Sequence, residues 1–228
     1  MAVYALSDLH GYLDLYKQIK EFLKPEDKVY FLGDAGDRGP QSWETIKAIL
    51  YDEQFVYIKG NHDEMLIISA LHYWGEEHDS YGFYHDLIAN GGRDTWKDFL
   101  IDPKSKEIIY KLRDCPEEKI YYSIDKEIHL SHAGFTPGKE KKHLTWNRKH
   151  LYDIVGDNVP DNYLVVHGHT PVYYMHNAKT YEDCQKWIKP EFYGEGHKIN
   201  IDMGTYNNGA CCLLNLDTLK YHIFTTKV

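Results

Sequence analysis

The chain has 228 residues, 43% hydrophobic and 27% charged, which are ordinary values for a globular protein with a buried core. These values exclude a disordered or fibrous chain, and the length predicts a single domain over residues 1–228. The formal net charge of -9 has the wrong sign for a protein that holds nucleic acid by its phosphates, so no stable nucleic-acid binding is expected.

The sequence carries no signal for export or membrane insertion. Asp8 ends the first apolar run, which has no basic segment before it, so no secretory signal is predicted. No stretch approaches the roughly 20 apolar residues of a membrane helix, and no membrane partner is expected. The spacing of Cys115, Cys184, Cys211 and Cys212 fits no metal or redox motif, which indicates reduced thiols and a cytoplasmic protein.

The first 71 residues alternate between predicted strands and helices. Short apolar runs predict strands at residues 3–6, 28–32 and 55–58. Glycines interrupt the chain after these runs, and apolar residues at helical spacing predict helices over 13–23, 43–50 and 65–71. Three consecutive strand-helix units indicate an α/β fold with a parallel sheet covered by helices.

The remainder of the chain changes character twice. Residues from about 72 to 118 are aromatic and polar, and we interpret them as a mostly helical insertion. Strands are predicted after it at 119–124, 127–131, 163–166, 198–203, 210–216 and 219–226. The last two would form a hairpin through Asp217-Thr218, and the neighbours Cys211 and Cys212 would point to opposite faces of their strand.

Five short polar strings containing glycine follow predicted strands. They are Asp8-Leu9-His10-Gly11, the seven residues GDAGDRG from Gly33 to Gly39, Gly60-Asn61-His62-Asp63, Ser131-His132-Ala133-Gly134 and His167-Gly168-His169-Thr170. Ligands of open α/β sheets bind beyond strand ends, and glycine lets a backbone turn sharply there. We therefore expect side chains from separate strands to converge on one site.

The donors in these strings are carboxylates, an amide and imidazoles, without a thiolate. Such a mixture suits divalent ions such as Mn, Fe, Zn or Ni. The donors suffice for two ions, and two ions about 3.5–4 Å apart, bridged by one carboxylate, can hold a hydroxide for in-line attack on phosphorus. The strings therefore predict hydrolysis of a phosphate ester.

The order D-x-H, G-D-x-x-D-R-G, G-N-H-[ED], H-x-G and G-H-T resembles the calcineurin-like metallophosphoesterases, and within them the phosphoprotein phosphatase branch. Bacterial and phage lambda-type phosphatases and symmetrical diadenosine tetraphosphatases are the most similar members. The similarity spans residues 7 to about 172 and is weaker at 201–204. It implies an α/β fold, a β-sandwich of two mixed sheets flanked by helices, with a dimetal site on loops at the strand ends.

The resemblance also implies roles for individual residues. It assigns Asp8 and His10 to a first metal ion, Asp34 to the bridge, and Asn61, His132 and His169 to a second ion. His62 is the implied general acid, and Asp37 is implied to orient it. Arg38 and Arg148 complete the implied catalytic set. Arg148 lies in the segment Trp146-Asn147-Arg148, which is similar to a segment of the family. The expected substrate-binding residues are Arg38, Arg148, Asn61 and Arg93. For Arg93, a solvated cation without a role in binding is an equal alternative.

Several positions leave alternatives open. Ser7 stands where most relatives have glycine, and Asp63 replaces the commoner glutamate, which could weaken a contact around the ligands. His167 is read as a core or supporting residue rather than a ligand. The insertion aromatics Trp74, Tyr81, Tyr84 and Trp96 are expected to pack together, with stacking on a substrate ring as the alternative.

We predict an enzyme that uses two divalent ions, manganese first and iron, zinc or nickel as alternatives. Serine/threonine phosphoproteins are the first predicted substrate class. Dinucleoside polyphosphates are the second, with the insertion aromatics holding adenine. A non-catalytic metal-binding scaffold is disfavoured, because residues such as Asp37, Arg38 and His62 would bind no metal and are nevertheless present.

Overall fold

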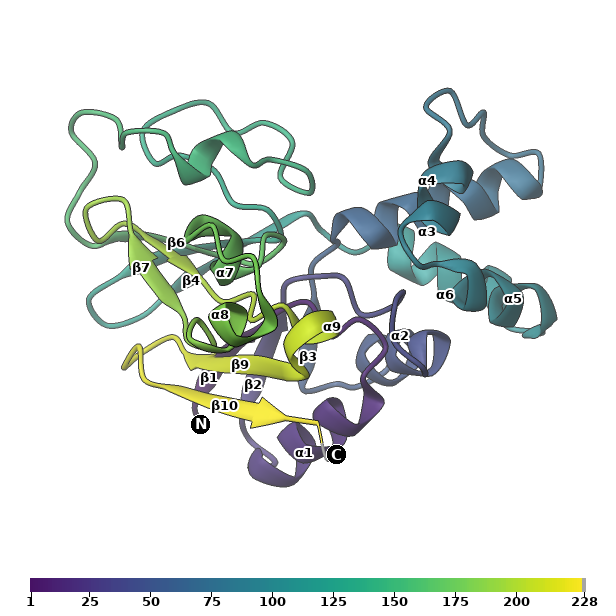
Figure 1. The fold of residues 1–228 in the computed structure, drawn as a ribbon, viewed down its shortest axis with the longest axis horizontal. Coiled ribbons are helices and arrows are strands. Elements are labelled where there is room, and N and C mark those ends of the chain that lie inside the picture. Colours follow the sequence, from purple (N-terminus) through teal and green to yellow (C-terminus); the bar gives the residue numbers. More distant parts are fainter. Residues whose placement is uncertain (227–228) are drawn as a thin grey trace.

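Two five-stranded sheets pack against each other in the computed structural model, which describes residues 1–226 (Figure 1). The first sheet consists of β1 (Val3–Leu6), β2 (Lys28–Phe31), β3 (Phe55–Tyr57), β9 (Ala210–Asn215) and β10 (Tyr221–Thr225) in the order β10-β9-β1-β2-β3. The strands β1, β2 and β3 are parallel, as their strand-helix pattern predicts, whereas β9 is antiparallel to both β1 and β10.

The second sheet is also mixed. It consists of β4 (Glu118–Tyr122), β5 (Glu127–Ser131), β6 (Tyr163–His167), β7 (Glu191–Tyr193) and β8 (Lys198–Asn200) in the order β4-β5-β6-β8-β7. The three central strands are parallel, and the edge strands β4 and β7 are antiparallel to their neighbours. The predicted α/β fold of two mixed sheets flanked by helices is confirmed.

Alternation along the strands produces two separate cores. Val3 and Ala5 of β1 face the second sheet, whereas Tyr4 and Leu6 face the helices on the other side. The neighbours Cys211 and Cys212 divide in the same way between the two cores, as predicted. The sheet that carries the first site loops is therefore buried on both faces.

Three helices follow the first three strands: α1 (Leu13–Phe22), α2 (Ser42–Leu50) and α3 (Asn61–Tyr73). The stretch predicted as a helical insertion contains α4 (Phe83–Ala89), α5 (Arg93–Ile101) and α6 (Ser105–Arg113), which lie beside α3 at the right of Figure 1. The second half adds only η1 (Lys149–Leu151), α7 (Val172–Met175), α8 (Tyr181–Gln185) and α9 (Thr205–Asn208). Within residues 1–226, no helix is long and apolar enough to cross a membrane.

Some element boundaries differ from the sequence prediction. The strand predicted over 198–203 ends at Asn200, because the side chains of Asn200 and Asp202 accept hydrogen bonds from nearby backbone N–H groups and bend the chain. The sequence analysis does not predict β7, whose three residues are partly or fully exposed and include Glu191, unlike the apolar run of the equally short edge strand β3. The third helix starts at Asn61 rather than 65, and it therefore includes most of one polar string.

The buried Phe31, at the end of β2, supports the loop that begins with Gly33. We expect Phe31→Ala to lower the free energy of unfolding by about 3–5 kcal/mol, because it leaves a cavity between β2 and its helices. Ile101→Ala removes a side chain that is 79% exposed and should change stability by less than about 0.5 kcal/mol. Chemical denaturation of both variants tests the prediction, and equal losses would contradict it.

Candidate active site

The loops after β1, β2, β3, β5 and β6 meet at one edge of the sandwich and bring the predicted residues together. The backbone connects these loops directly: the His10 N–H donates to the Asp34 carbonyl at 3.0 Å, and the Gly168 N–H donates to the His132 carbonyl at 2.8 Å. The strings bury these carboxylate, amide and imidazole side chains at this edge: Asp8, His10, Asp34, Asp37, Asn61, His62, Asp63, His132, His167 and His169. The expected convergence of separate strands is thus present.

Asp34 lies between two groups of potential metal ligands. Its carboxylate belongs to one group with Asp8 and His132 and to another with His10 and His62, and within each group the donor atoms lie within 4.8 Å of one another. A carboxylate shared by two groups is what a bridged pair of ions requires. The two groups divide the residues differently from the predicted ion sites, which pair Asp8 with His10 and leave His62 outside the ligands. The role of Asp34 as the bridge stays a prediction.

Donor atoms crowd around His132. Its Nε2 lies 3.0 Å from Asn61 Oδ1, 3.2 Å from His169 Nδ1 and 3.3 Å from Asp34 Oδ2. A single proton on Nε2 cannot satisfy three such partners. The four side chains therefore have the composition and spacing of a cation site. Without a bound ion, burial acts to lower the pKa of His132, but Asp34 and Asp8 outweigh it and raise the pKa to about 10, so a cation there would displace a proton.

The far sides of two histidines are fixed by the backbone. His10 Nδ1 lies 2.9 Å from the Gly36 carbonyl, and His132 Nδ1 lies 2.6 Å from the Leu32 carbonyl. An Nδ1–H that donates to a carbonyl leaves the Nε2 lone pair facing the site, as in metal-binding histidines. The buried His169 Nε2 has no hydrogen-bond partner among the described residues. These observations fit a pair of divalent ions held by the predicted ligands.

Burial and neighbouring charges shift the pKa values of these groups in different directions. Burial raises the pKa of Asp8 to about 6. For Asp34, burial acts in the same sense, but His132 and His62 outweigh it and hold the pKa well below its ordinary value. Burial and then Arg38 lower the pKa of His10, so this ring is neutral and able to donate a lone pair.

His62 lies at the start of α3 within a chain of polar contacts. Its Nδ1 is 2.6 Å from Asp37 Oδ2, and the other oxygen of Asp37 accepts a hydrogen bond from Thr95 Oγ1 at 2.6 Å. The His62 backbone N–H donates to Asp34 Oδ1 at 3.0 Å. Both the ring and the backbone of His62 are therefore held in place by residues of the GDAGDRG string.

The exposed Arg38 bridges two histidines. Its Nη1 lies 2.9 Å from His10 Nε2, and its Nη2 lies 2.7 Å from His62 Nε2. Because a guanidinium only donates hydrogen bonds, both ring nitrogens accept here. In this arrangement Nδ1 of His62 faces Asp37 and its Nε2 faces Arg38.

The site backbone is unusual. Asp8, His10, Asp34, Asp37, Arg38 and His169 all have a positive φ, between 45° and 68°. Non-glycine residues rarely adopt such angles, and strained conformations of this kind cluster at functional sites.

Gly168 allows two of these loops to approach closely. A Cβ there would overlap Asp8 Oδ2 and Ser7 Oγ, and Ser7 Oγ itself donates to that Asp8 oxygen. We expect Gly168→Ala to lower turnover by at least about 10²-fold, because Asp8 must move by a large fraction of an ångström. Gly196→Ala is the control: its Cβ meets open space, so only its φ of 89° adds a local cost of about 1–2 kcal/mol. Similar activity in the two variants would contradict the expectation.

Asp63 supports the turn that carries Asn61. Its Oδ2 accepts hydrogen bonds from the N–H groups of Gly60 at 2.8 Å and Asp34 at 3.1 Å, and its Oδ1 accepts one from Tyr57 Oη at 2.8 Å. The shorter acid thus reaches both loops. His167, interpreted as a supporting residue, contacts His150 and Tyr193 on the side away from the proposed ligands.

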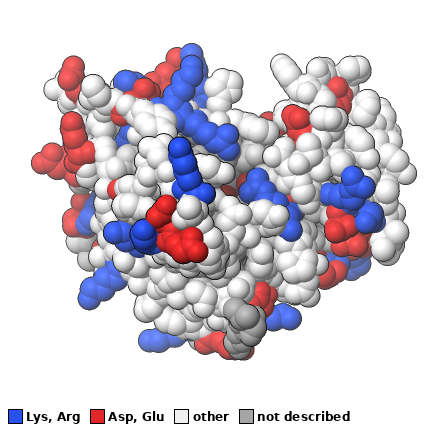
Figure 2. Space-filling model, in the orientation of Figure 1, with Lys and Arg blue, Asp and Glu red and all other residues white. Residues whose placement is uncertain are grey.

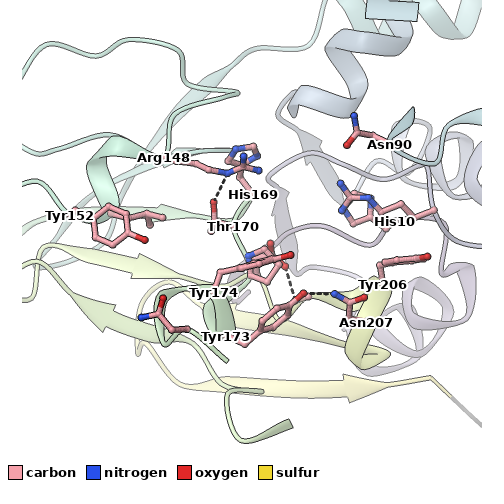
Figure 3. Close-up of a pocket in the computed structure, with 16 residues that line it drawn as sticks. His10, Asn90, Arg148, Tyr152, His169, Thr170, Tyr173, Tyr174, Tyr206 and Asn207 are labelled. Carbon is pink, nitrogen blue, oxygen red and sulfur yellow. Dashed lines mark hydrogen bonds between the residues drawn. The ribbon is translucent and has the colours of Figure 1, made fainter. Parts of the chain in front are cut away.

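A cavity of about 790 Å³ opens beside the proposed ligands, and Figure 2 shows this face of the molecule hollowed between two lobes. His10 and His169 lie at its wall together with Arg38 and Arg148, and Arg148 Nε donates to Thr170 Oγ1 at 3.3 Å (Figure 3). Arg93, at the exposed start of α5, is not among the residues that line this cavity.

Sequence reasoning did not single out several residues of the cavity wall. Asp202 is buried there, and burial and then Asp8 raise its pKa well above the ordinary value. The wall also contains Tyr173 and Tyr174, four and five residues after His169, and Tyr206 just after Gly204. The available signal was their closeness in sequence to the His167-Gly168-His169-Thr170 string and to residues 201–204, where the family similarity is weaker.

The insertion aromatics mostly pack on one another. The rings of Trp96 and Phe99 stack at 4.6 Å, and Tyr84 and Trp74 lie against this pair at 5.1 and 5.4 Å. The expectation that they pack together is confirmed for these residues, whereas Tyr81 is 83% exposed and contacts Phe83.

Two similar proteins with curated descriptions carry the same name. The chain is 30% identical over 142 residues to a symmetrical bis(5'-nucleosyl)-tetraphosphatase of Pseudomonas syringae pv. tomato, covering 60% of this chain and 42% of that protein. It is 28% identical over 187 residues to a symmetrical bis(5'-nucleosyl)-tetraphosphatase of Nitrosococcus oceani, covering 80% of this chain and 62% of that protein. The chain thus spans less than half of the first of these relatives.

Similar solved structures share the fold and differ in the substrates that their names state. A metallophosphoesterase from Sphaerobacter thermophilus has a TM-score of 0.58 at 16% identity, covering 100% of this chain and 89% of that one. A serine/threonine phosphatase from Saccharomyces cerevisiae has a TM-score of 0.57 at 13% identity, covering 100% and 80%. A cold-active protein-tyrosine phosphatase of a Shewanella species has a TM-score of 0.56 at 17% identity, covering 99% and 80%.

A family model for calcineurin-like phosphoesterases matches residues 1–198. This match covers every polar string and Arg148. The chain therefore belongs to the calcineurin-like phosphoesterase family, whose members are metal-dependent hydrolases that use a dimetal site.

Proposed function

We propose that this phosphoesterase hydrolyses dinucleoside polyphosphates, with two divalent ions held by the buried cluster. The proposed ligands are Asp8, His10, Asp34, Asn61, His132 and His169, with Asp34 shared by both ions. When bound, the two ions would neutralise phosphate charge and activate water for in-line attack. Manganese is the proposed metal, and the donors also suit iron, zinc and nickel. The observation that carries this proposal is the Asp34 carboxylate shared between two groups of potential ligands at a cavity.

His62 is the proposed general acid. Asp37 accepts its Nδ1–H and orients the ring, so that Nε2 faces the site and can carry the proton for the leaving oxygen. Thr95 holds Asp37 in turn, which removes freedom from the pair. This arrangement lets one imidazole protonate the leaving group without a change of tautomer at Nδ1.

Arg38 and Arg148 are proposed to bind the phosphate oxygens. Arg38 now donates to the ring nitrogens that metal binding and proton transfer require, at His10 and His62. Its exposed side chain must therefore turn into the cavity when the site is loaded, where a planar guanidinium can pair with a phosphate. Arg93 stays a weaker candidate for a phosphate contact, because it lies outside the cavity lining.

The choice of substrate rests on the named relatives. Both curated relatives described above are symmetrical bis(5'-nucleosyl)-tetraphosphatases, although each is only about 30% identical. Serine/threonine phosphoproteins are the second candidate, because Arg148 from the Trp146-Asn147-Arg148 segment shares the cavity wall with Arg38. The scaffold hypothesis is not retained, since the family and the relatives are hydrolases. We also propose a cytoplasmic protein, in keeping with four free cysteines.

The proposal is tested by assaying metal-stripped protein in parallel against diadenosine tetraphosphate, a phosphoserine peptide and an aryl phosphate, each with and without manganese. We expect manganese-dependent cleavage of the dinucleotide, with ADP as the nucleotide product. Preferential release of phosphate from the peptide would support the second candidate. No turnover of any of the three substrates would contradict both.

A further inference from the structure

The lining of the cavity beside the proposed metal site is of two chemical kinds. His10, His169, Arg38 and Arg148 suit phosphate, and several tyrosines offer aromatic surface. A volume of about 790 Å³ is far larger than one phosphate group and lies within the range of small-molecule sites. The cavity thus has room for a second part of the substrate beyond the phosphate chain.

Three exposed tyrosines line this space, Tyr152, Tyr174 and Tyr206, and the last two belong to helices that are tied to each other. Tyr174 comes from α7 and Tyr206 from α9, and their side chains lie on different walls in Figure 3. Tyr174 is 58% exposed and Tyr206 is 52% exposed. Neither hydroxyl takes part in a hydrogen bond within the described chain, so both rings are available to a ligand.

Tyr173 makes this part of the wall rigid. Its ring is buried, its hydroxyl accepts a hydrogen bond from Asn207 Nδ2, and its ring centroid lies 4.8 Å from that of Tyr174. Asn207 belongs to α9, so this contact ties α7 to α9. The two exposed rings are therefore held by a buried neighbour rather than placed on a free loop.

Aromatic rings that face a solvent-filled space beside an anion site suit a nucleobase. Stacking on an aromatic side chain stabilises a bound base, and a nucleotide joins such a base to phosphates through one sugar. The insertion aromatics offer no comparable surface at the cavity, because none of Trp74, Tyr81, Tyr84 and Trp96 lines it. The second candidate substrate, a phosphopeptide, gives no specific partner for the two exposed phenol rings.

We propose that Tyr174 and Tyr206 hold the nucleobase of a nucleotide whose phosphate chain reaches the metal site. This inference rests on the proposed function. It assigns binding of the base to residues of α7 and α9 instead of the insertion aromatics. Both tyrosines are specificity-determining residues, because they contact the part of the substrate that does not react.

The test uses full-length protein with manganese and the variants Tyr174→Ala and Tyr206→Ala. We expect the KM for diadenosine tetraphosphate to rise about tenfold in each, as for the loss of one stacking partner. The inhibition constant of inorganic tripolyphosphate, which has no base, should stay within about twofold of wild type. Tyr174→Phe and Tyr206→Phe should restore the KM, and Tyr181→Ala, at a 64% exposed tyrosine outside the cavity, is the matched control.

Calorimetric binding of ADP separates this inference from the proposed function, because it needs no turnover. A tenfold weaker ADP affinity in both alanine variants supports the subsite even if the dinucleotide is not cleaved. Unchanged ADP affinity and KM in the alanine variants would overturn it, as would equal losses for ADP and tripolyphosphate. Turnover that is best with a phosphopeptide and insensitive to both tyrosines would also overturn it.

Discussion

Replacement of His62 by asparagine is expected to lower kcat on diadenosine tetraphosphate by about 10²–10⁴-fold, the usual range for a lost general acid. Asparagine approximates the ring size but cannot deliver a proton to the leaving oxygen. The fold should be retained, because Asp37 keeps its hydrogen bond from Thr95 and the His62 backbone N–H remains bonded to Asp34. The measurement is kcat at saturating substrate with manganese present.

Two comparisons make this result specific. His85→Asn changes a histidine whose side chain is 88% exposed, and it should leave kcat unchanged. A substrate with a better leaving group, such as a nitrophenyl phosphate, should be affected less by His62→Asn, since its leaving oxygen needs less protonation. An equal loss for good and poor leaving groups would assign His62 to binding or positioning instead.

Asp34→Asn is expected to have the second large effect. Its carboxylate is common to both groups of potential ligands and is the proposed ligand shared by the two ions, so the substitution would remove a negative charge from both proposed ion sites. We expect the apparent manganese affinity to fall by more than about 10²-fold. This loss is larger than the loss expected when a residue that only orients a metal ligand is replaced. The measurement is activity as a function of manganese concentration.

Thermal unfolding gives a readout of Asp34→Asn that does not depend on turnover. Manganese at 100 times its Kd should stabilise the wild-type protein by about 2.7 kcal/mol, because it binds the folded state. The variant should show no such shift at the same concentration. Asp98→Asn, at an exposed aspartate of α5, is the control and should keep the wild-type response. A wild-type shift in Asp34→Asn would contradict the role of Asp34 as a shared ligand.

Local patterns accounted for the first half of the fold. The runs at 3–6, 28–32 and 55–58 are short and, apart from Lys28, apolar. Each is followed by a polar string, so their strands could be placed within one or two residues. The pairing of β1 with β9 could not be read from these runs, because the partner lies about 210 residues later. Local periodicity alone therefore indicated a parallel sheet, and only the resemblance implied mixed sheets.

The candidate site was predictable for a related reason. Residues such as Asp8, Asp34 and His132 directly follow strands, and strand ends meet at one edge, so short motifs carried information on three-dimensional proximity. Tyr174 and Tyr206 lie on four-residue helices whose sequences have no distinguishing period. Their meeting across a cavity depends on how α7 and α9 pack, which a single sequence does not express.

The central claim is that the buried cluster around Asp34 binds two divalent ions that the hydrolysis requires. The most direct measurement is a titration of metal-stripped protein with manganese, in which bound metal and cleavage of diadenosine tetraphosphate are followed in the same samples. We predict saturation at two ions per chain, with turnover appearing only as both sites fill. Full turnover in metal-free protein, or saturation without any hydrolysis of a phosphoester, would contradict the claim.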